Sequence, residues 1–166
     1  MTVFQHIDSI LTRFIRFILG ATSAVIFLVT FLSVVFRYLL KSPLPWSQDV
    51  IRLAFTYMFF FGAAYCVRDN SHLNVDVLLG VLGNKTRKIV EILINLVLLG
   101  FFLFLMSFGF SFAQMGYIQT TSYLMLPMTY YYLGIPLSAI CMIFYVVQNI
   151  FGQVKFLNGA EGGKNV

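Results

Sequence analysis

The residues that could carry out chemistry in this sequence are few and far apart. The two cysteines, Cys66 and Cys141, lie inside apolar stretches, whereas the two histidines, His6 and His72, lie outside them. Cysteine pairs with the spacing of a zinc site or a thiol oxidase are therefore missing. No histidine is placed to ligate a haem between helices. The sequence predicts neither an enzyme nor a cofactor or metal site.

Ionisable groups border the apolar stretches but do not enter their middle. A secondary transporter generally needs an ionisable or unwound polar site near the bilayer midplane. Asp49, Arg52 and Glu91 instead lie within about two turns of a predicted helix end, where side chains reach water or headgroups. Asn95 is a weak candidate for such a site, and we expect it to form a hydrogen bond between helices rather than a substrate contact. The sequence thus indicates a membrane protein without a solute site of its own.

The composition of the chain explains why reactive side chains are few. Of the 166 residues, 60% are hydrophobic and 10% are charged, and the mean hydropathy of +0.88 is far above that of a soluble domain. At about 20 residues per crossing, the chain has room for four crossings and for no soluble catalytic domain. Its 11 Lys and Arg residues are spread between the apolar stretches rather than gathered on one face, which favours membrane topology over nucleic-acid binding.

The elements that must position the remaining polar residues are four apolar helices. We expect an all-α integral membrane protein with one domain over residues 1–158 and a flexible tail over residues 159–166. The predicted crossings are residues 14–37, 47–67, 89–113 and 130–152. A short amphipathic helix over residues 74–82 is expected to lie in the membrane interface. Small residues recur four apart, which lets helices approach closely, at Gly20 and Ala24, Ser107 and Ser111, Gly109 and Ala113, and Gly134 and Ser138.

The basic residues set the expected orientation. Eight of the 11 lie on the side of the two termini, and the other three are Arg37, Lys41 and Arg52. Because cytoplasmic loops carry the excess of Lys and Arg, we expect both termini in the cytoplasm.

One stretch of about 40 residues carries a pattern of polar and small residues. It reads Phe36-Arg37-Tyr38, Pro45-Trp46-Ser47-Gln48-Asp49-Val50, Arg52, Gly62-Ala63-Ala64, Val67-Arg68 and His72-Leu73-Asn74-Val75-Asp76. In order and spacing this stretch resembles the small membrane subunit, of the DctQ type, of tripartite ATP-independent periplasmic (TRAP) transporters. The length and the four-helix layout extend the resemblance to the whole chain. Gln48-Asp49 is a departure, because the family usually has Glu, often doubled, after the Trp.

The resemblance implies a complex in the bacterial inner membrane. A much larger membrane subunit (M-type) would carry the substrate and sodium by an elevator motion. A periplasmic binding protein (P-type) would deliver an organic acid such as sialic acid or a C4-dicarboxylate. This chain would then be a fixed scaffold, surrounded by lipid and by the large subunit.

Candidate contacts to the large subunit come from the same pattern. They are Arg37, Tyr38, Trp46, Asp49, Arg52, His72 and Asp76. Each has a plainer alternative. The first three residues are suited to anchoring helices at the membrane interface, and Asp49 and Arg52 can pair within one helix. His72 and Asp76 can cap or solvate the expected interfacial helix.

The uncharged connection between the third and fourth crossings is the candidate docking floor for the binding protein. Its polar residues are Gln119, Thr120, Thr121 and Ser122. The alternative is an ordinary connection held in the interface by tyrosines.

Two other functions compete with the scaffold hypothesis. A stand-alone four-helix exporter that works as a homodimer would need a carboxylate in the first crossing, and residues 17–36 contain none. A four-helix membrane enzyme or assembly factor would be supported by a bound cofactor, which an absorbance spectrum would reveal.

Overall fold

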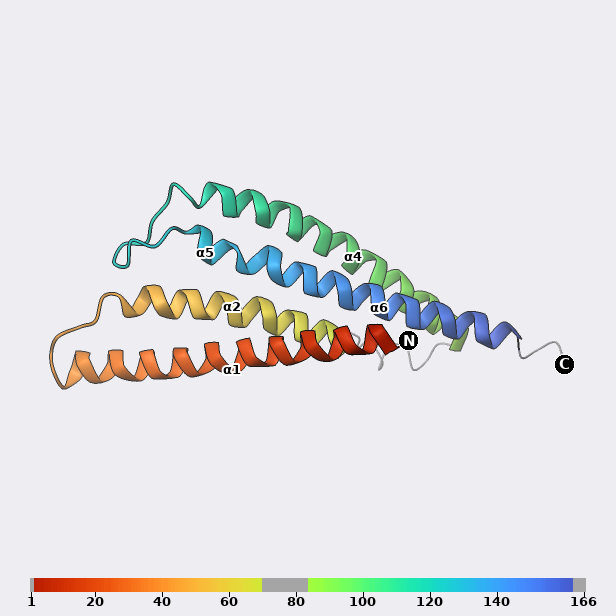
Figure 1. Cartoon of the computed structure of the whole chain (residues 1–166), viewed down its shortest axis with the longest axis horizontal. Helices are drawn as coiled ribbons and strands as arrows, with labels where there is room; N and C mark the ends of the chain where they lie inside the picture. The colour runs from red at the N-terminus through yellow and green to blue at the C-terminus, as the bar shows by residue number, and fades with distance from the viewer. Residues whose placement is uncertain (1, 70–83, 163–166) are drawn as a thin grey trace.

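The computed structural model describes residues 2–69 and 84–162, and most of these residues are helical (Figure 1). The elements are α1 (Thr2–Tyr38), α2 (Ser47–Arg68), α4 (Asn84–Met115), α5 (Thr129–Tyr132) and α6 (Gly134–Gly162). Four segments are long and apolar enough to cross a membrane: Asp8–Tyr38, Ser47–Arg68, Ile92–Met115 and Thr129–Gln153. The prediction of an all-α membrane protein with four crossings is therefore confirmed.

Some expected boundaries differ from those of the helices. α1 begins at Thr2, well before the crossing expected from residue 14, because the polar residues ahead of the apolar run continue its helix. The expected tail overlaps α6, which continues to Gly162 through the good helix formers Ala160 and Glu161. The interfacial helix expected over residues 74–82 lies outside the described residues, as do His72 and Asp76.

A left-handed residue and two prolines separate α1 from α2. Lys41 adopts a φ of 51°, and the N–H of Ser42 donates to the carbonyl of Phe36 at 3.1 Å. This return of the backbone ends α1. Pro43 and Pro45 then keep the chain extended, because proline disfavours helix in the residue before it. α2 can begin only beyond them, at Ser47.

The fourth crossing is built from two helices, α5 and α6, that follow one another with a break at Leu133. Pro136 accounts for the break. It has no N–H to donate to the carbonyl four residues earlier, at Tyr132, and its ring crowds that carbonyl. The helical hydrogen bonds resume when the N–H of Leu137 donates to Leu133 at 3.3 Å.

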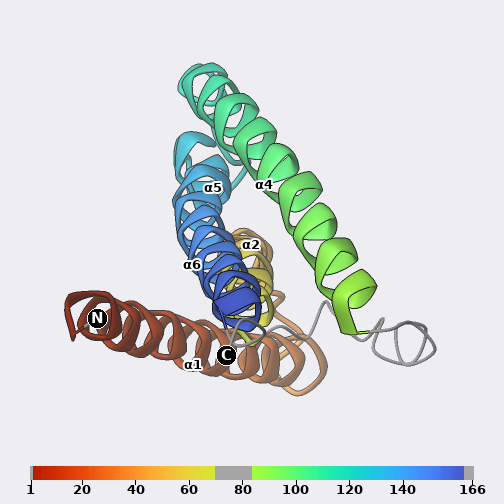
Figure 2. The same cartoon turned by 90° about the vertical axis from the view of Figure 1, so that its right-hand side faces the viewer.

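The four crossings pack side by side in the order α1, α2, α6, α4 (Figures 1 and 2). α2 and α6 pack on each other in the centre. α1 packs chiefly on α2, and α4 chiefly on α6 and α5. The core that joins them is a cluster of buried residues: Ile15, Phe61, Ala64, Val67, Phe102, Cys141, Met142, Tyr145 and Val146.

One of the small-residue pairs makes a close helix crossing. A Cβ added to Gly109 of α4 would lie 3.0 Å from side-chain atoms of Ile135 and Pro136 and 3.2 Å from the backbone nitrogen of Pro136. The absence of a side chain therefore allows α4 to approach the start of α6. By contrast, a Cβ added to Gly20 of α1 would meet nothing within 4 Å.

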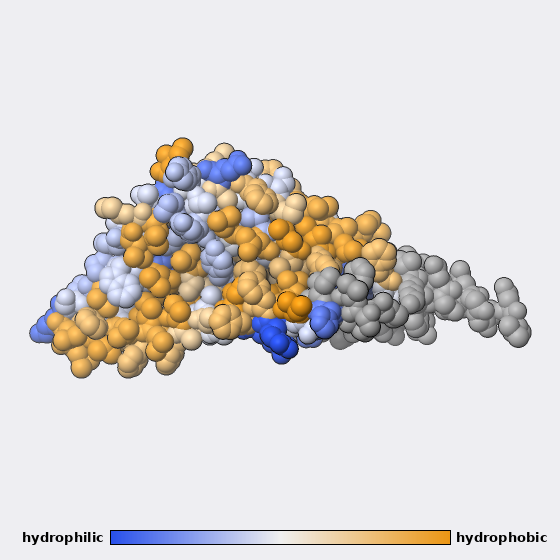
Figure 3. Space-filling view, viewed as in Figure 1, coloured by the Kyte–Doolittle hydropathy of each residue, from blue (hydrophilic) through white to orange (hydrophobic). Residues whose placement is uncertain are grey.

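The flanking helices keep large apolar faces exposed. None of the most apolar 18-residue window of α1 is buried, compared with 44% for the fourth crossing. Much of the visible surface is hydrophobic, as expected for a chain surrounded by lipid or by another membrane protein (Figure 3).

Candidate partner interface

The polar residues gather at the two ends of the molecule. We call the end that contains residues 37–52 and 114–133 the loop end. The opposite end, where α1 begins and α6 finishes, is the terminal end (Figure 1). Different contacts join the helices at each of the two ends.

At the loop end, Asp49 fastens α2 to the connection that follows α4. Its side chain lies in the first turn of α2, and the residue is only 6% exposed. Its Oδ2 atom accepts hydrogen bonds from the backbone N–H groups of Tyr123, at 3.2 Å, and Leu124, at 3.1 Å. An ionised carboxylate strengthens such bonds, and the helix N-terminus favours its charge. We call this pair of bonds the Asp49 clasp.

Two tyrosine hydroxyls join α2 to α5 beside the clasp. Tyr131 donates to the backbone carbonyl of Asp49 at 2.9 Å, and Tyr57 donates to the backbone carbonyl of Tyr130 at 2.9 Å. The start of the fourth crossing is thereby fixed against the second crossing.

The connection itself is a hydrogen-bonded hairpin over residues 119–128, which we call the periphery hairpin. The N–H of Thr121 donates to Leu126 at 2.9 Å, and the N–H of Met128 donates to Gln119 at 2.8 Å. The Thr121 hydroxyl accepts from the N–H of Leu126 at 3.1 Å. Met125 adopts a φ of 51° where the chain turns back.

The docking candidates therefore divide into two groups. Gln119, Thr120 and Ser122 are exposed, whereas Thr121 is 3% exposed and uses its hydroxyl inside the hairpin.

The candidates for contact with a large subunit also divide. Arg37, Tyr38, Trp46 and Arg52 are exposed. Asp49 is not, and its carboxylate turns to the hairpin amides. Among the described residues, the structure shows an ion pair between Asp8 and Arg68 and none between Asp49 and Arg52.

The Asp8–Arg68 pair belongs to a polar cluster at the terminal end that sequence reasoning missed. Arg68 donates from Nε and Nη2 to the two carboxylate oxygens of Asp8, at 3.0 and 2.9 Å. One turn along α1, the hydroxyl oxygens of Thr12 and Tyr145 lie 3.3 Å apart. These contacts join α1 to α2 and α6. Arg68 is part of the pattern quoted above, but 60 residues separate it from Asp8, and no local spacing signals that pairing.

Amide side chains complete the junctions at this end. Asn95 of α4 donates to Gln153 of α6 at 3.1 Å, so the predicted interhelical hydrogen bond of Asn95 is confirmed. Asn149 of α6 donates to the backbone carbonyl of Val67 at 3.4 Å.

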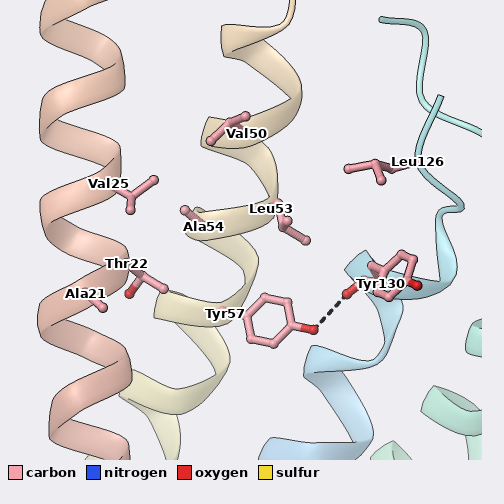
Figure 4. Close-up of a pocket in the computed structure, with 9 residues that line it drawn as sticks. All are labelled: Ala21, Thr22, Val25, Val50, Leu53, Ala54, Tyr57, Leu126 and Tyr130. Atoms are coloured by element: carbon pink, nitrogen blue, oxygen red, sulfur yellow. Dashed lines mark hydrogen bonds between the residues drawn. The ribbon is translucent and has the colours of Figure 1, made fainter. Parts of the chain in front are cut away.

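An apolar groove lies between α1, α2 and the start of α5 (Figure 4). Its volume is about 420 Å³, and its walls include Ala21, Val25, Leu53, Ala54 and Leu126. Two of the hydroxyl groups that line it have partners within the chain. The Thr22 hydroxyl donates to Ile18 at 2.7 Å, and the Tyr57 hydroxyl donates to Tyr130. Such a lining suits an acyl chain or an apolar side chain and offers no group for chemistry.

Comparison with known proteins decides what kind of membrane protein this is. Residues 26–156 match the family described as "Tripartite ATP-independent periplasmic transporters, DctQ component". The chain belongs to this family. It is a TRAP transporter small permease subunit, and the resemblance seen in the sequence is confirmed.

Individual relatives agree with this assignment. A TRAP transporter small permease protein of Haemophilus influenzae is 25% identical over 152 residues, which are 92% of each chain. The sialic acid TRAP transporter small permease protein SiaQ of Vibrio cholerae is 25% identical over 78% of this chain and 75% of its own. The C4-dicarboxylate TRAP transporter small permease protein DctQ of Rhodobacter capsulatus is 35% identical over 68% of this chain and 50% of its own.

A longer relative bears on the partner of TRAP small subunits. The isethionate TRAP transporter permease protein DctMQ of Oleidesulfovibrio alaskensis is 24% identical over 87% of this chain, and the match covers 24% of that protein. TRAP small subunits partner with large M-type permeases, and in the DctMQ protein the two are parts of one polypeptide. As a small subunit of this kind, the chain is a transport component and not an enzyme.

Proposed function

We propose that this TRAP small subunit is the fixed scaffold of a sodium-driven importer of an organic acid. The large subunit carries the substrate and the sodium, and this chain holds it in the inner membrane. The observation that carries the proposal is the unequal burial of the helices. The most apolar window of α1 buries none of its residues within the chain and that of the third crossing buries 17%, against 22% for α2 and 44% for the fourth crossing. The outer faces of α1 and α4 are the surfaces that the large subunit and lipid would cover.

The buried polar groups support a scaffold rather than a carrier. Thr12 and Tyr145 bond to each other, Asn95 bonds to Gln153, and the Ser138 hydroxyl donates to Ile135 within its own helix at 2.9 Å. The first two contacts hold helices together, and in the described part of the chain every buried side-chain nitrogen or oxygen has a hydrogen-bond partner.

Two relatives support a proposal for the substrate class. One belongs to a sialic acid system and another to a C4-dicarboxylate system. Both are carboxylates, and we propose an acid of this kind as the cargo, with its contacts on the large subunit.

The loop end is the proposed periplasmic side, and both termini lie in the cytoplasm. This orientation puts three of the 11 basic residues, Arg37, Lys41 and Arg52, outside and the remainder inside. The exposed Gln119, Thr120 and Ser122 then face the periplasm, where the binding protein would dock. The border between this surface and the large subunit is formed by four exposed residues, Arg37, Tyr38, Trp46 and Arg52.

Co-purification tests the scaffold directly. A tagged large subunit encoded with this chain should retain it in detergent at a fixed ratio, and deletion of this chain should abolish uptake of the organic acid by cells. Undiminished uptake after deletion would contradict the proposal.

A further inference from the structure

We infer that Asp49 is a positioning residue for the docking of the binding protein: the Asp49 clasp fixes where the periphery hairpin lies, and Asp49 touches no partner itself. The inference rests on the proposed function, because it takes the loop end as the docking side. It differs from a direct contact between Asp49 and the large subunit, which the sequence pattern alone favours.

The geometry of the carboxylate supports an indirect role. Two consecutive backbone N–H groups converge on one oxygen, Oδ2, at 3.2 and 3.1 Å. The residue is 6% exposed, so the hairpin covers the acid that holds it. A buried carboxylate without hydrogen-bond donors is energetically costly, because water cannot replace them. The side chain of Asp49 is therefore held toward the two amides.

The hairpin keeps its own shape without Asp49. The bonds between Thr121 and Leu126 and between Gln119 and Met128 lie entirely within the hairpin. Removing the clasp should therefore release the hairpin from α2 as a formed unit rather than unfold it.

The base of the hairpin is fixed independently of its tip. The Thr129 hydroxyl donates to the backbone carbonyl of Ala113 at 3.0 Å. A Cβ added to Gly116 would lie 2.7 Å from the backbone nitrogen of Thr129, so α4 and α5 meet closely at this point. With its base held by α4 and α5, the hairpin depends on Asp49 for the position of its tip against α2.

A hairpin that is already fixed in the free subunit favours docking, because binding then requires no further loss of its conformational entropy. When a surface loop must be ordered during association, that cost is subtracted from the affinity. Loss of the clasp should weaken docking of the binding protein about tenfold, a change of about 1.4 kcal/mol. Assembly with the large subunit should not change, because the clasp lies within this chain.

The test uses the intact complex of both membrane subunits in nanodiscs and the cognate periplasmic binding protein as the probe. Asp49→Ala removes both the charge and the acceptor, whereas Asp49→Asn removes the charge and keeps an acceptor oxygen. Asp8→Asn is the matched control, because it neutralises a carboxylate at the terminal end. Surface plasmon resonance measures docking, and hydrogen–deuterium exchange resolved to single amides measures the clasp.

The expected result is a clear separation of the variants. Asp49→Ala weakens docking about tenfold and speeds exchange at the amides of Tyr123 and Leu124, while those of Thr121 and Met128 stay protected. Asp49→Asn recovers most of the affinity, and Asp8→Asn docks like the parent complex.

Four outcomes would overturn the inference and leave the scaffold proposal standing. The first is unchanged docking in Asp49→Ala, and the second is equal impairment in Asp49→Asn, which would point to charge alone. The third is loss of the large subunit from the Asp49→Ala complex, which would point to a direct subunit contact. The fourth needs no substitution: rapid exchange at Tyr123 and Leu124 in the parent complex would show that the clasp does not form.

Discussion

The central helices α2 and α6 and the flanking helices α1 and α4 share one composition but differ in what they bury. All four are long and apolar. α2 and α6 pack on each other and on a flanking helix, whereas each flanking helix packs chiefly on one side. In the fourth crossing 44% of the most apolar window is buried and in α1 none is, while α2, with 22%, and the third crossing, with 17%, lie close together between them. Hydrophobicity therefore places a helix in the membrane, but the neighbours on its faces determine whether it belongs to the core.

The difference assigns separate tasks to the two pairs of helices. Close packing and polar contacts at α2 and α6 hold the subunit together. The open faces of α1 and α4 are available to lipid and to the large subunit. Substitutions on the two kinds of surface should accordingly affect different measurements.

The largest expected effect comes from filling the close crossing of α4 and α6. Gly109→Leu places a side chain against Ile135 and Pro136, where even a Cβ lies at 3.0 Å. We expect the subunit to lose about 3 kcal/mol of stability, measured as a lower midpoint of thermal unfolding in detergent.

Gly20→Leu is the matched control on a flanking helix. The added Cβ meets nothing within 4 Å, so the isolated subunit should keep its unfolding midpoint. Retention by the large subunit should fall if this face of α1 is covered in the complex. Equal destabilisation by the two substitutions would remove the distinction between central and flanking helices.

A smaller effect is expected where α1 is tethered to α2. Arg68→Ala removes both bonds to Asp8. Because the two side chains are 33% and 20% exposed, water screens part of the interaction, and we expect a loss of about 1 to 2 kcal/mol.

A double-mutant cycle with Asp8→Ala measures the tether itself. The double variant should be little less stable than either single variant. Arg68→Lys should recover only part of the loss, since an ammonium group cannot reproduce the two parallel bonds. Strict additivity of the two alanine substitutions would show that the pair does not contribute.

The smallest effect is expected at the junction of α4 and α6. Asn95→Leu removes the hydrogen bond to Gln153 and should cost about 0.6 kcal/mol, because such bonds contribute little between membrane helices. Leu96→Ala on the exposed side of the same helix is the control and should leave the unfolding midpoint of the isolated subunit unchanged. A loss of several kcal/mol at Asn95 would instead indicate a central role for this bond.

The sequence was sufficient for the features set by local composition. The four apolar runs predicted the crossings, including the start of the second crossing at residue 47. The polar side chain of Asn95 in an apolar helix predicted an interhelical bond, which the structure confirms.

Contacts between distant segments could not be predicted in the same way. Asp49 and Arg52 are three positions apart and suited to pairing, yet Asp49 bonds to backbone amides 74 and 75 positions away. Backbone N–H groups carry no residue-specific signal, and only the fold brings them to the carboxylate. The pairing of Asp8 with Arg68 is equally long-range. Which helix faces stay exposed also depends on the packing order α1, α2, α6, α4. Hydropathy does not encode that order.

Reconstituted transport tests the central claim, that this chain holds a transporting subunit and carries nothing itself. Proteoliposomes would contain this chain alone, the large subunit alone, or both, with the binding protein outside, an inward sodium gradient, and labelled sialic acid and succinate as probes. The scaffold account predicts uptake of the cognate acid only where both membrane subunits are present. Uptake by this chain alone, or full uptake by the large subunit alone, would contradict it.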